Sequence, residues 1–297
     1  MNAPLRAATR AGALDALRSR FERAGIATAA AEAEALLLHG LGLSRAGLWC
    51  EPGAAIAPEE ARALESLATR RERRVPLQHL IGEVDFHEVT LDVEPGIFIP
   101  RPETESLVEA ALDALGATDA PAAGRLLDLG TGTGAIAIAM LQSLPRWTAD
   151  AVDRSQAATA LAVRNAARNG CAPRLRAITA DFSTDSGVPA EGPYDLVISN
   201  PPYIATDALA GLMPEVRDFD PREALDGGPD GLSAYRAIAQ RLPRILRIGG
   251  VLALEIGEDQ ADDLRGILGP GLEALRVRND LAGRPRIVVG TWRGGVA

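Results

Sequence analysis

The apolar positions of the first eighty residues recur at helical spacing. Between Ala11 and Leu43 they fall three or four residues apart, and Gly25 divides this segment into two predicted helices. Pro58 begins another, because proline suits the first turn of a helix and two acidic residues follow it. This helix runs to the arginines between 70 and 74, which are predicted to be a solvated helix end, against the alternative of a surface that docks a macromolecular partner. Together these elements predict a small helical domain over residues 1–80.

The period changes between residues 81 and 98. Apolar and polar residues alternate from Val84 to Val93, which predicts a short β-hairpin linking two domains. A helix is predicted from Glu103 to Leu115, and from Gly124 onward strands and helices alternate. This alternation predicts an α/β fold with a parallel sheet over residues 99–297. The last predicted strands, 275–279 and 286–292, are joined by a turn at 281–285 and would form an antiparallel edge.

Length and composition agree with a two-domain globular chain. The 297 residues are 47% hydrophobic, which is ample for a core. Cys50 and Cys171 form no motif and the three histidines are scattered, so we expect no metal site. Unpaired thiols, together with no signal-peptide pattern and no apolar run of membrane-spanning length, indicate a cytoplasmic protein that does not enter membranes.

Charge is unevenly divided along the chain. All 31 basic residues are arginine, and the formal net charge is −9. Residues 1–75 carry 11 arginines against 9 acidic residues, whereas the remainder carries 20 against 31. The acidic second part opposes binding to a phosphate backbone, so we expect no stable nucleic-acid binding.

Candidate chemistry begins at Asn200-Pro201-Pro202-Tyr203, directly after the predicted strand 194–199. Two prolines cannot continue a sheet, and the carboxyl end of a strand is where ligands bind in open α/β sheets. The Asn200 amide oxygen and the Pro201 carbonyl can accept N–H protons, and Tyr203 offers a flat face. The segment therefore predicts a clamp for a planar group that carries NH2, against the alternative of a proline-rich turn.

A glycine turn follows another predicted strand. Gly130, Thr131, Gly132, Thr133 and Gly134 space their glycines as G-x-G-x-G, unlike the G-x-G-x-x-G of dinucleotide folds. Glycines let the backbone approach a ligand closely. Asp128, just before the turn, would repel a pyrophosphate but could hold an ammonium group. This combination suits the amino-acid end of S-adenosylmethionine and argues against a nicotinamide dehydrogenase.

Polar groups follow two further strands. Asp153 lies 23 residues beyond Gly130, about where nucleotide-binding folds place the carboxylate for ribose hydroxyls. Asp181 and Phe182 follow the strand 175–179, where they could accept from an adenine amine and cover its ring. The alternatives are that Asp181 is a helix N-cap and Phe182 a core residue.

Four segments together resemble a known family. They are Ile-Pro-Arg-Pro-Glu-Thr-Glu at 99–105, the glycine turn at 128–134, Ser-Asn-Pro-Pro-Tyr-Ile at 199–204, and residues 223–232. They are similar to the peptide chain release factor glutamine-N5 methyltransferases (the HemK/PrmC family), over about residues 76–289. The first segment is the discriminating one. The chain departs mildly at Asp220-Pro221, where the family often has Glu-Pro, and at Phe182, where it often has tryptophan.

The resemblance implies a seven-stranded class I (Rossmann-like) methyltransferase sheet with an antiparallel terminal strand. It implies S-adenosylmethionine as cofactor, S-adenosylhomocysteine as product, and the glutamine of the Gly-Gly-Gln motif in class-1 release factors as substrate. Catalysis is expected from Asn200, Pro201 and Tyr203, with Pro202 and Phe98 also at the substrate. Phe98 could equally be a packing residue. The N-terminal domain would bind the partner, and the protein is expected to be a monomer.

Three alternatives stay open. An adenine-N6 methyltransferase for RNA or DNA would use the same Asn-Pro-Pro-Tyr segment on an unpaired base. A glutamine methyltransferase for a ribosomal protein would share most of the motifs. A non-catalytic release-factor or ribosome-binding protein would need no intact site, whereas Asp128, Asp153 and Asn200 are all present. The long acidic segment from Ala205 to Gly231 is predicted to form part of the substrate rim.

Overall fold

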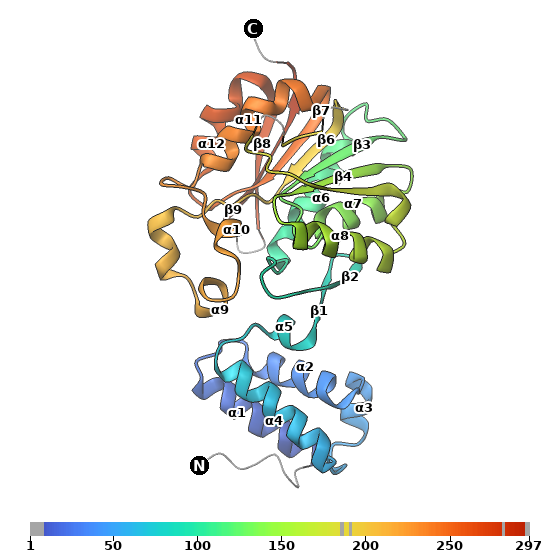
Figure 1. Cartoon of the computed structure of the whole chain (residues 1–297), viewed down its shortest axis with the longest axis vertical. Helices are drawn as coiled ribbons and strands as arrows, with labels where there is room; N and C mark the ends of the chain where they lie inside the picture. The colour runs from blue at the N-terminus through green and yellow to red at the C-terminus, as the bar shows by residue number, and fades with distance from the viewer. Residues whose placement is uncertain (1–8, 185–186, 190–191, 281–282, 295–297) are drawn as a thin grey trace. The chain divides into compact units, whose positions relative to one another are not determined.

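The structure is a computed structural model that describes residues 9–184, 187–189, 192–280 and 283–294. It divides into two compact units, Met1–Glu83 and Val84–Ala297. Figure 1 shows that helices form the first unit and that a sheet with helices forms the second. The sequence predicted a boundary near residue 80.

The first unit is a helical bundle, as its periodicity predicted. Its helices pack around a shared apolar core that includes Leu17, Phe21 and Leu64. Arg20, only 4% exposed, is paired with Glu65 and Glu72, each at 2.8 Å. The helices are α1 (Arg10–Arg23), α2 (Ala29–Leu41), α3 (Arg45–Cys50), α4 (Pro58–Glu72) and α5 (Leu77–Ile81).

The arginine cluster that was predicted to be solvated has one buried member. Arg71 is 3% exposed and forms an ion pair with Glu32 of α2. A buried guanidinium needs such a partner, because an unpaired buried charge is costly. No local pattern sets the register between α2 and α4, so this pairing was not predictable.

The second unit contains a seven-stranded sheet in the order β5-β4-β3-β6-β7-β9-β8. The first five strands in this order are parallel, and β9 pairs antiparallel with both β7 and β8. The predicted class I sheet with an antiparallel terminal strand is therefore confirmed. The strands are β3 (Arg125–Leu129), β4 (Thr148–Asp153), β5 (Leu175–Thr179), β6 (Tyr194–Ser199), β7 (Leu246–Glu255), β8 (Leu272–Asn279) and β9 (Pro285–Trp292).

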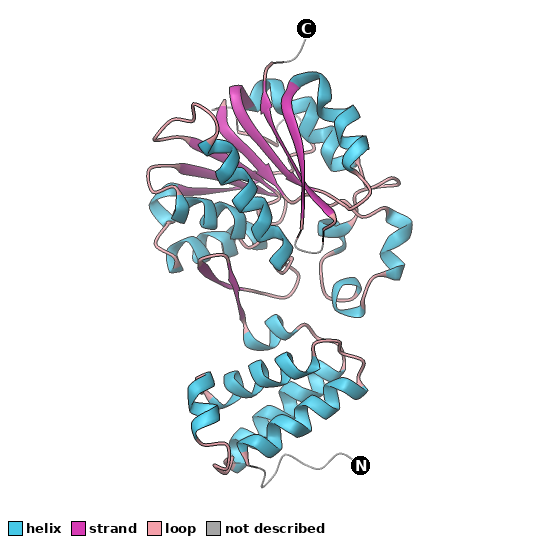
Figure 2. Cartoon of the chain, turned by 180° about the vertical axis from the view of Figure 1, so that it is seen from behind, coloured by secondary structure: helices cyan, strands magenta, loops and turns pink. Residues whose placement is uncertain are grey.

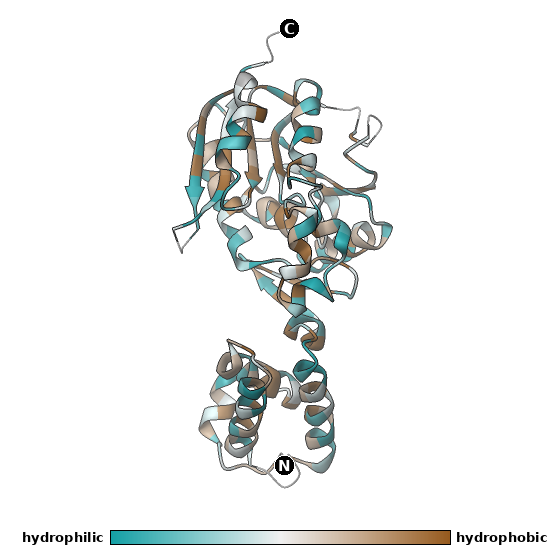
Figure 3. Ribbon diagram, turned by 90° about the vertical axis from the view of Figure 1, so that its left-hand side faces the viewer, coloured by the Kyte–Doolittle hydropathy of each residue, from teal (hydrophilic) through white to brown (hydrophobic). Residues whose placement is uncertain are grey.

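Helices cover both faces of this sheet, as Figure 2 shows with the strands in magenta between them. Alternate strand residues serve the two faces: Leu126 belongs to one apolar cluster and Leu127 to the other. The helices carry both hydrophobic and hydrophilic stretches in Figure 3, as expected of elements with one buried face. One face packs α6 (Pro102–Gly116) and α7 (Ala135–Ser143), and the other packs α11 (Ser233–Ile245) and α12 (Ala261–Leu268).

The hairpin consists of β1 (Glu83–Phe86) and β2 (Val89–Asp92) and is shorter than predicted. It is fastened to the second unit through α8 (Gln156–Arg168): the Asn165 side chain accepts from Asp92 N at 2.8 Å and donates to Asp92 O at 3.0 Å. Residues 93–98 then run on as loop. They lead into the Ile-Pro-Arg-Pro segment, so the hairpin positions that segment beside the sheet.

The long segment after Tyr203 is not structureless. It contains η2 (Thr206–Gly211), α9 (Pro214–Arg217) and α10 (Arg222–Leu225), and it returns beside its own start. Ile204 N donates to Leu225 O at 3.0 Å, and Gly227 N donates to Ile204 O at 2.8 Å. These bonds join the start of the segment to its later part and hold α10 near the end of β6. The predicted turn at 281–285 lies in part outside the described residues, which omit 281 and 282.

Candidate active site

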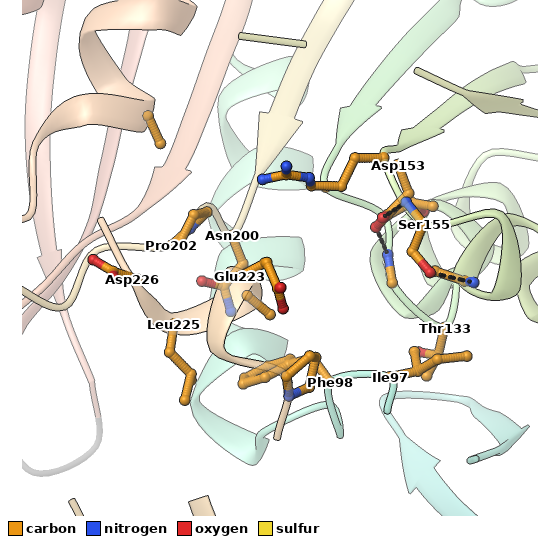
Figure 4. Close-up of a pocket in the computed structure, with 18 of the residues that line it drawn as sticks. Ile97, Phe98, Thr133, Asp153, Ser155, Asn200, Pro202, Glu223, Leu225 and Asp226 are labelled. Atoms are coloured by element: carbon orange, nitrogen blue, oxygen red, sulfur yellow. Dashed lines mark hydrogen bonds between the residues drawn. The ribbon is translucent and has the colours of Figure 1, made fainter. Parts of the chain in front are cut away.

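A pocket of about 600 Å³ lies at the carboxyl ends of β3, β4, β5 and β6. In the strand order, β4 and β5 lie on one side of β3, whereas β6 lies on the other. Such a reversal leaves a crevice between the loops that leave neighbouring strands, and ligands of open α/β sheets bind there. Figure 4 shows residues from the two sides of this crevice facing a common space, with Asp153 and Ser155 on one side and Asn200 and Glu223 on the other.

The glycine turn forms one end of the pocket. Gly130, Gly132 and Gly134 have φ angles of +75°, +56° and +85°, which L-residues with side chains rarely adopt. A Cβ on Gly134 would lie 3.1 Å from the Ala162 Cβ, so this glycine also lets α7 begin close to α8. A Cβ on Gly132 would meet nothing within 4 Å, which leaves its backbone open to a ligand. Gly130 to Thr133 line the pocket, whereas Gly134 lies behind it.

Asp128 lies behind the turn and is not among the residues that line the pocket. Its Oδ2 accepts a hydrogen bond from Thr131 Oγ1 at 2.6 Å. Among the described residues, its Oδ1 has no hydrogen-bond partner although it is buried. Burial raises the pKa of Asp128 to about 7, while the Thr131 hydrogen bond lowers it. A buried carboxyl with a spare acceptor is a group that a nearby cation would stabilise in its ionised form.

Asp153 and Asp181 line the pocket beside the turn. Asp153 accepts from Gly132 N and Ser155 N, both at 2.9 Å, so it fixes the turn as well as facing the pocket. Burial raises the pKa of Asp153 despite these two bonds. Asp181 accepts from Ser183 N at 2.8 Å, and although burial acts to raise its pKa, the bonds from Ser183 lower it overall.

Phe182 is both a packing residue and a pocket residue, and its place over an adenine ring stays a prediction. It packs against the apolar cluster on the α11 face, and it also lines the pocket. Its ring edge would lie 3.8 Å from a Cβ at Gly130, so the ring lies beside the glycine turn.

The opposite end of the pocket is formed by Asn200, Pro202 and Tyr203. Asn200 Nδ2 donates to Thr104 Oγ1 at 3.1 Å. Pro201 is buried and does not line the pocket. Burial raises the pKa of Tyr203 to about 12, so this ring stays a neutral surface over the ordinary pH range. The turn is fixed further by Gln260, whose Nε2 donates to Tyr203 O at 2.9 Å.

Phe98 lines the pocket and is held from behind. The Arg101 guanidinium lies over its ring, 5.1 Å from the centroid, and forms an ion pair with Asp220. Asp220 also accepts from Ile99 N at 3.5 Å. The carboxylate therefore connects the long loop after Tyr203 to the segment that carries Phe98.

The structure adds residues that the sequence did not single out. Thr104 and Glu223 line the pocket, and Glu255 lies behind Thr104. Thr104 stands within the Ile-Pro-Arg-Pro-Glu-Thr-Glu motif, which was the available signal for it. Glu255 ends β7, a strand that was not predicted individually from the sequence. Of the predicted loop rim, 221 and 223–226 line the pocket and residues 205–220 do not.

Two features are absent from the part of the chain that the structure describes. No helix in that part of the chain is both long and apolar enough to cross a membrane. Within the same residues, no three or more His, Cys, Asp or Glu side chains are grouped so as to hold a metal ion.

The sheet order, the antiparallel β8–β9 pair and the pocket beside a glycine turn define a class I methyltransferase. Two solved structures support this fold. A methyltransferase from Pyrococcus furiosus has a TM-score of 0.50 at 17% identity, over 69% of this chain and 89% of that one. The hMettl16 catalytic domain, solved with an RNA hairpin, has a TM-score of 0.53 at 16% identity, over 81% of this chain and 84% of that one.

Sequence comparison is more specific. Residues 12–82 match the PrmC N-terminal domain, and residues 94–213 match the methyltransferase small domain. A release factor glutamine methyltransferase of Rhodospirillum rubrum is 39% identical over 92% of this chain and 82% of its own length. That of Cereibacter sphaeroides is 43% identical over 93% of this chain and 97% of its own. The chain belongs to the family of release factor glutamine methyltransferases, which confirms the resemblance seen in its motifs.

Proposed function

We propose that this protein transfers a methyl group from S-adenosylmethionine to the side-chain nitrogen of a glutamine in a translation release factor. The glutamine is that of the Gly-Gly-Gln motif in class-1 factors, and the other product is S-adenosylhomocysteine. The names of the relatives support the acceptor, and the methyltransferase fold supports the donor. The residues below are assigned from their motifs and from their place in the pocket or directly behind it.

The orientation of the Asn200 amide is the observation that carries this proposal. Its Nδ2 is engaged by Thr104, and among the described residues no hydrogen bond occupies its Oδ1. An amide held in this way has an acceptor to spare, and Asn200 lines the pocket. A glutamine side chain ends in an NH2 group that needs acceptors. The pocket thus has the hydrogen-bonding group that an incoming amide nitrogen requires.

The end of the pocket beside the glycine turn fits the cofactor. Asp128 has a buried acceptor without a partner, which suits the ammonium of the amino-acid end. Gly130 to Thr133 offer backbone without obstruction, Asp153 suits the ribose hydroxyls, and Asp181 with Phe182 suits adenine. When bound, the sulfonium supplies an electrophilic methyl group and a neutral leaving group.

The protein's own contribution is orientation and electrostatic stabilisation. The lone pair of an amide nitrogen is delocalised, so the nitrogen must be held in line with the methyl carbon, about 3–3.5 Å away. Asn200 Oδ1 would accept one of its N–H groups and stabilise the positive charge that develops there. The Pro201 carbonyl, predicted from the sequence to accept the other, belongs to a residue that is buried outside the pocket lining, so Asn200 carries this role in the proposal. Tyr203 and Phe98 would pack against the flat amide. We assign no side-chain base, because the proton on the methylated nitrogen becomes acidic enough to leave to water.

The remaining assignments extend this proposal. Residues 1–80 would contact the release factor, 81–98 would link the two parts, and 99–297 would carry the catalytic site. The protein would act as a cytoplasmic monomer and form no stable complex with nucleic acid. The free state of Cys50 and Cys171 supports the cytoplasmic location. The acidic charge of residues 76–297 supports the absence of a stable complex with nucleic acid.

A competition experiment tests the acceptor. The protein is incubated with methyl-labelled S-adenosylmethionine and equal amounts of a release factor, ribosomal proteins and total RNA. The proposal predicts label in the release factor alone, lost when its Gly-Gly-Gln glutamine is replaced by alanine. Label in RNA adenine or in a ribosomal protein would reject the proposed acceptor while leaving the fold and cofactor site intact.

A further inference from the structure

A buried chain of hydrogen bonds runs behind the pocket from Asn200. Asn200 Nδ2 donates to Thr104 Oγ1 at 3.1 Å, and Thr104 Oγ1 donates to Glu255 Oε2 at 2.7 Å. Thr104 is 3% exposed and Glu255 is 2% exposed, so water does not compete for these bonds. A buried carboxyl is costly, and the proposed transfer gives Glu255 no contact with the substrate.

Three elements bring these residues together. Asn200 follows β6 and Glu255 ends β7, and the register pairs Ser199 with Leu254, so the next residues on the two strands are neighbours. Thr104 lies in the first turn of α6, whose start is set by Pro102. The chain of bonds thus joins two adjacent strands to the helix that carries the family's discriminating motif.

The protons in this chain decide which end of the Asn200 amide faces the pocket. A hydroxyl has one proton, and an ionised carboxylate can only accept. Thr104 must therefore give its proton to Glu255 and can only accept from Asn200. Only the NH2 end of Asn200 can satisfy that acceptor, so the oxygen end is left for the pocket.

We propose that Thr104 and Glu255 are positioning residues that fix the Asn200 amide with its oxygen toward the acceptor nitrogen. This inference rests on the proposed function, because it is the methyl acceptor that needs an oxygen there. With the Asn200 amide reversed, its NH2 group would face the NH2 group of the acceptor glutamine, and no hydrogen bond could form between them. Neither residue touches the reacting atoms; both act through Asn200.

The protonation state of Glu255 controls this arrangement. Burial raises the pKa of Glu255 to about 7, against the opposing effect of the Thr104 hydrogen bond. A protonated Glu255 can donate to Thr104, which frees the hydroxyl proton to attract the amide oxygen. The other groups that face this carboxyl are Arg286 and the Tyr203 hydroxyl, which lower its pKa, Glu103, which raises it, and the Tyr235 hydroxyl, which donates to its backbone oxygen at 2.9 Å.

The test compares three variants in methyl transfer to a release factor at saturating cofactor. Thr104→Val keeps the shape and removes the hydroxyl, and we expect kcat to fall roughly 10- to 100-fold, less than the ~10²–10³ for removing a preorganised group outright. Thr104→Ser restores the hydroxyl and should recover kcat to within about 3-fold of wild type. Thr118→Val, two residues beyond the end of α6, is the matched control, because the Thr118 hydroxyl donates to Leu115 O in the last turn of that helix and lies outside the pocket lining.

Glu255→Gln supplies an independent readout that a merely structural role would not give. The wild-type kcat should fall as pH drops through about 7, where Glu255 becomes protonated. The variant should have a lower kcat at pH 8 and should lose this dependence. Binding of S-adenosylhomocysteine, measured by calorimetry, should stay within about 3-fold of wild type for every variant, a change of under roughly 0.7 kcal/mol.

The outcomes separate the two proposals. The positioning role is overturned if Thr104→Val keeps the wild-type kcat, or if kcat of Glu255→Gln still falls at low pH as it does in the wild type. In either case, methyl transfer by the wild type still supports the proposed function. A loss confined to KM for the release factor, with kcat intact, also overturns it. If the wild type binds S-adenosylhomocysteine but methylates no glutamine, the proposed function fails and this inference fails with it.

Discussion

The two side chains of the ion pair between Arg101 and Asp220 differ in their exposure to solvent, and this difference leads to a quantitative prediction. The Asp220 side chain is 0% exposed, whereas that of Arg101 is 29% exposed. Replacing Arg101 with methionine leaves a carboxylate with no counter-charge in the interior. Breaking a buried pair from one side costs about 3–5 kcal/mol. We take the lower end, about 3 kcal/mol, because Asp220 keeps the Ile99 N–H and can take up a proton.

The reverse change should cost less. In Asp220→Asn the guanidinium still reaches water and still lies over Phe98, so we expect a loss of about 1–2 kcal/mol, as for one charge-assisted hydrogen bond. The double variant should be no less stable than Arg101→Met alone, because the uncompensated charge is gone. The resulting coupling energy is at least about 1–2 kcal/mol.

The cost should depend on pH. Burial raises the pKa of Asp220 above its usual 3.8 in the native protein, while Arg101 and the Ile99 hydrogen bond lower it. Removing Arg101 raises this folded-state pKa further, so the folded variant binds a proton more tightly than the unfolded chain. The free energy of unfolding of Arg101→Met should therefore fall furthest below that of the wild type at pH 8. This difference should shrink as pH falls through the raised pKa of Asp220 toward about 4.

Urea denaturation followed by tryptophan fluorescence measures these values. Trp147 and Trp292 are buried in the second unit, whereas Trp49 of the first unit is 60% exposed and should change less on unfolding. Equal losses for Arg101→Met and Asp220→Asn would refute the reasoning. So would a deficit for Arg101→Met that is the same at pH 8 and pH 5.

Two further predictions concern the cofactor end. Binding of S-adenosylmethionine should release a proton and weaken as pH falls below about 7, because the ammonium needs Asp128 ionised; calorimetry in buffers of different ionisation enthalpy measures both, and Asp128→Asn should abolish the proton release. Gly134→Ala should lower the free energy of unfolding by at least ~1 kcal/mol, since φ is +85° and its Cβ would crowd Ala162. Gly170→Ala has a similar φ of +70° but open space, so it should cost less in the same denaturation experiment; equal costs would show that crowding plays no part.

Much of the architecture was present in local sequence. The strands at 175–179 and 194–199 have the bounds that the sequence predicted, and α4 begins at Pro58, as predicted. These features depend on neighbouring residues, so one sequence suffices to predict them. The seven-stranded sheet was predicted from the family resemblance, and its strand order was not predicted, because strand neighbours are set by long-range packing that no local pattern records.

The site was predicted as separate residues at strand ends, and the structure lines one pocket with most of them. The contacts between those residues were beyond the sequence. Thr104 and Glu255 lie 151 positions apart, and Ile99 and Asp220 lie 121 apart. Such pairs follow from the strand register and from the closed loop after Tyr203. Similarly, composition alone could not show that Asp128 lies behind the glycine turn and not in the pocket lining.

The most direct test of the central claim, a pocket that orients a glutamine amide through Asn200, is mass spectrometry of the release factor. The purified factor is incubated with this protein and S-adenosylmethionine, beside an Asn200→Ala variant shown by calorimetry to bind S-adenosylhomocysteine. The account predicts the mass of one methyl group on the Gly-Gly-Gln glutamine with the wild type, and a rate lower by about 10²–10³ with the variant. No methyl on that glutamine, or equal rates for the two proteins, would contradict it.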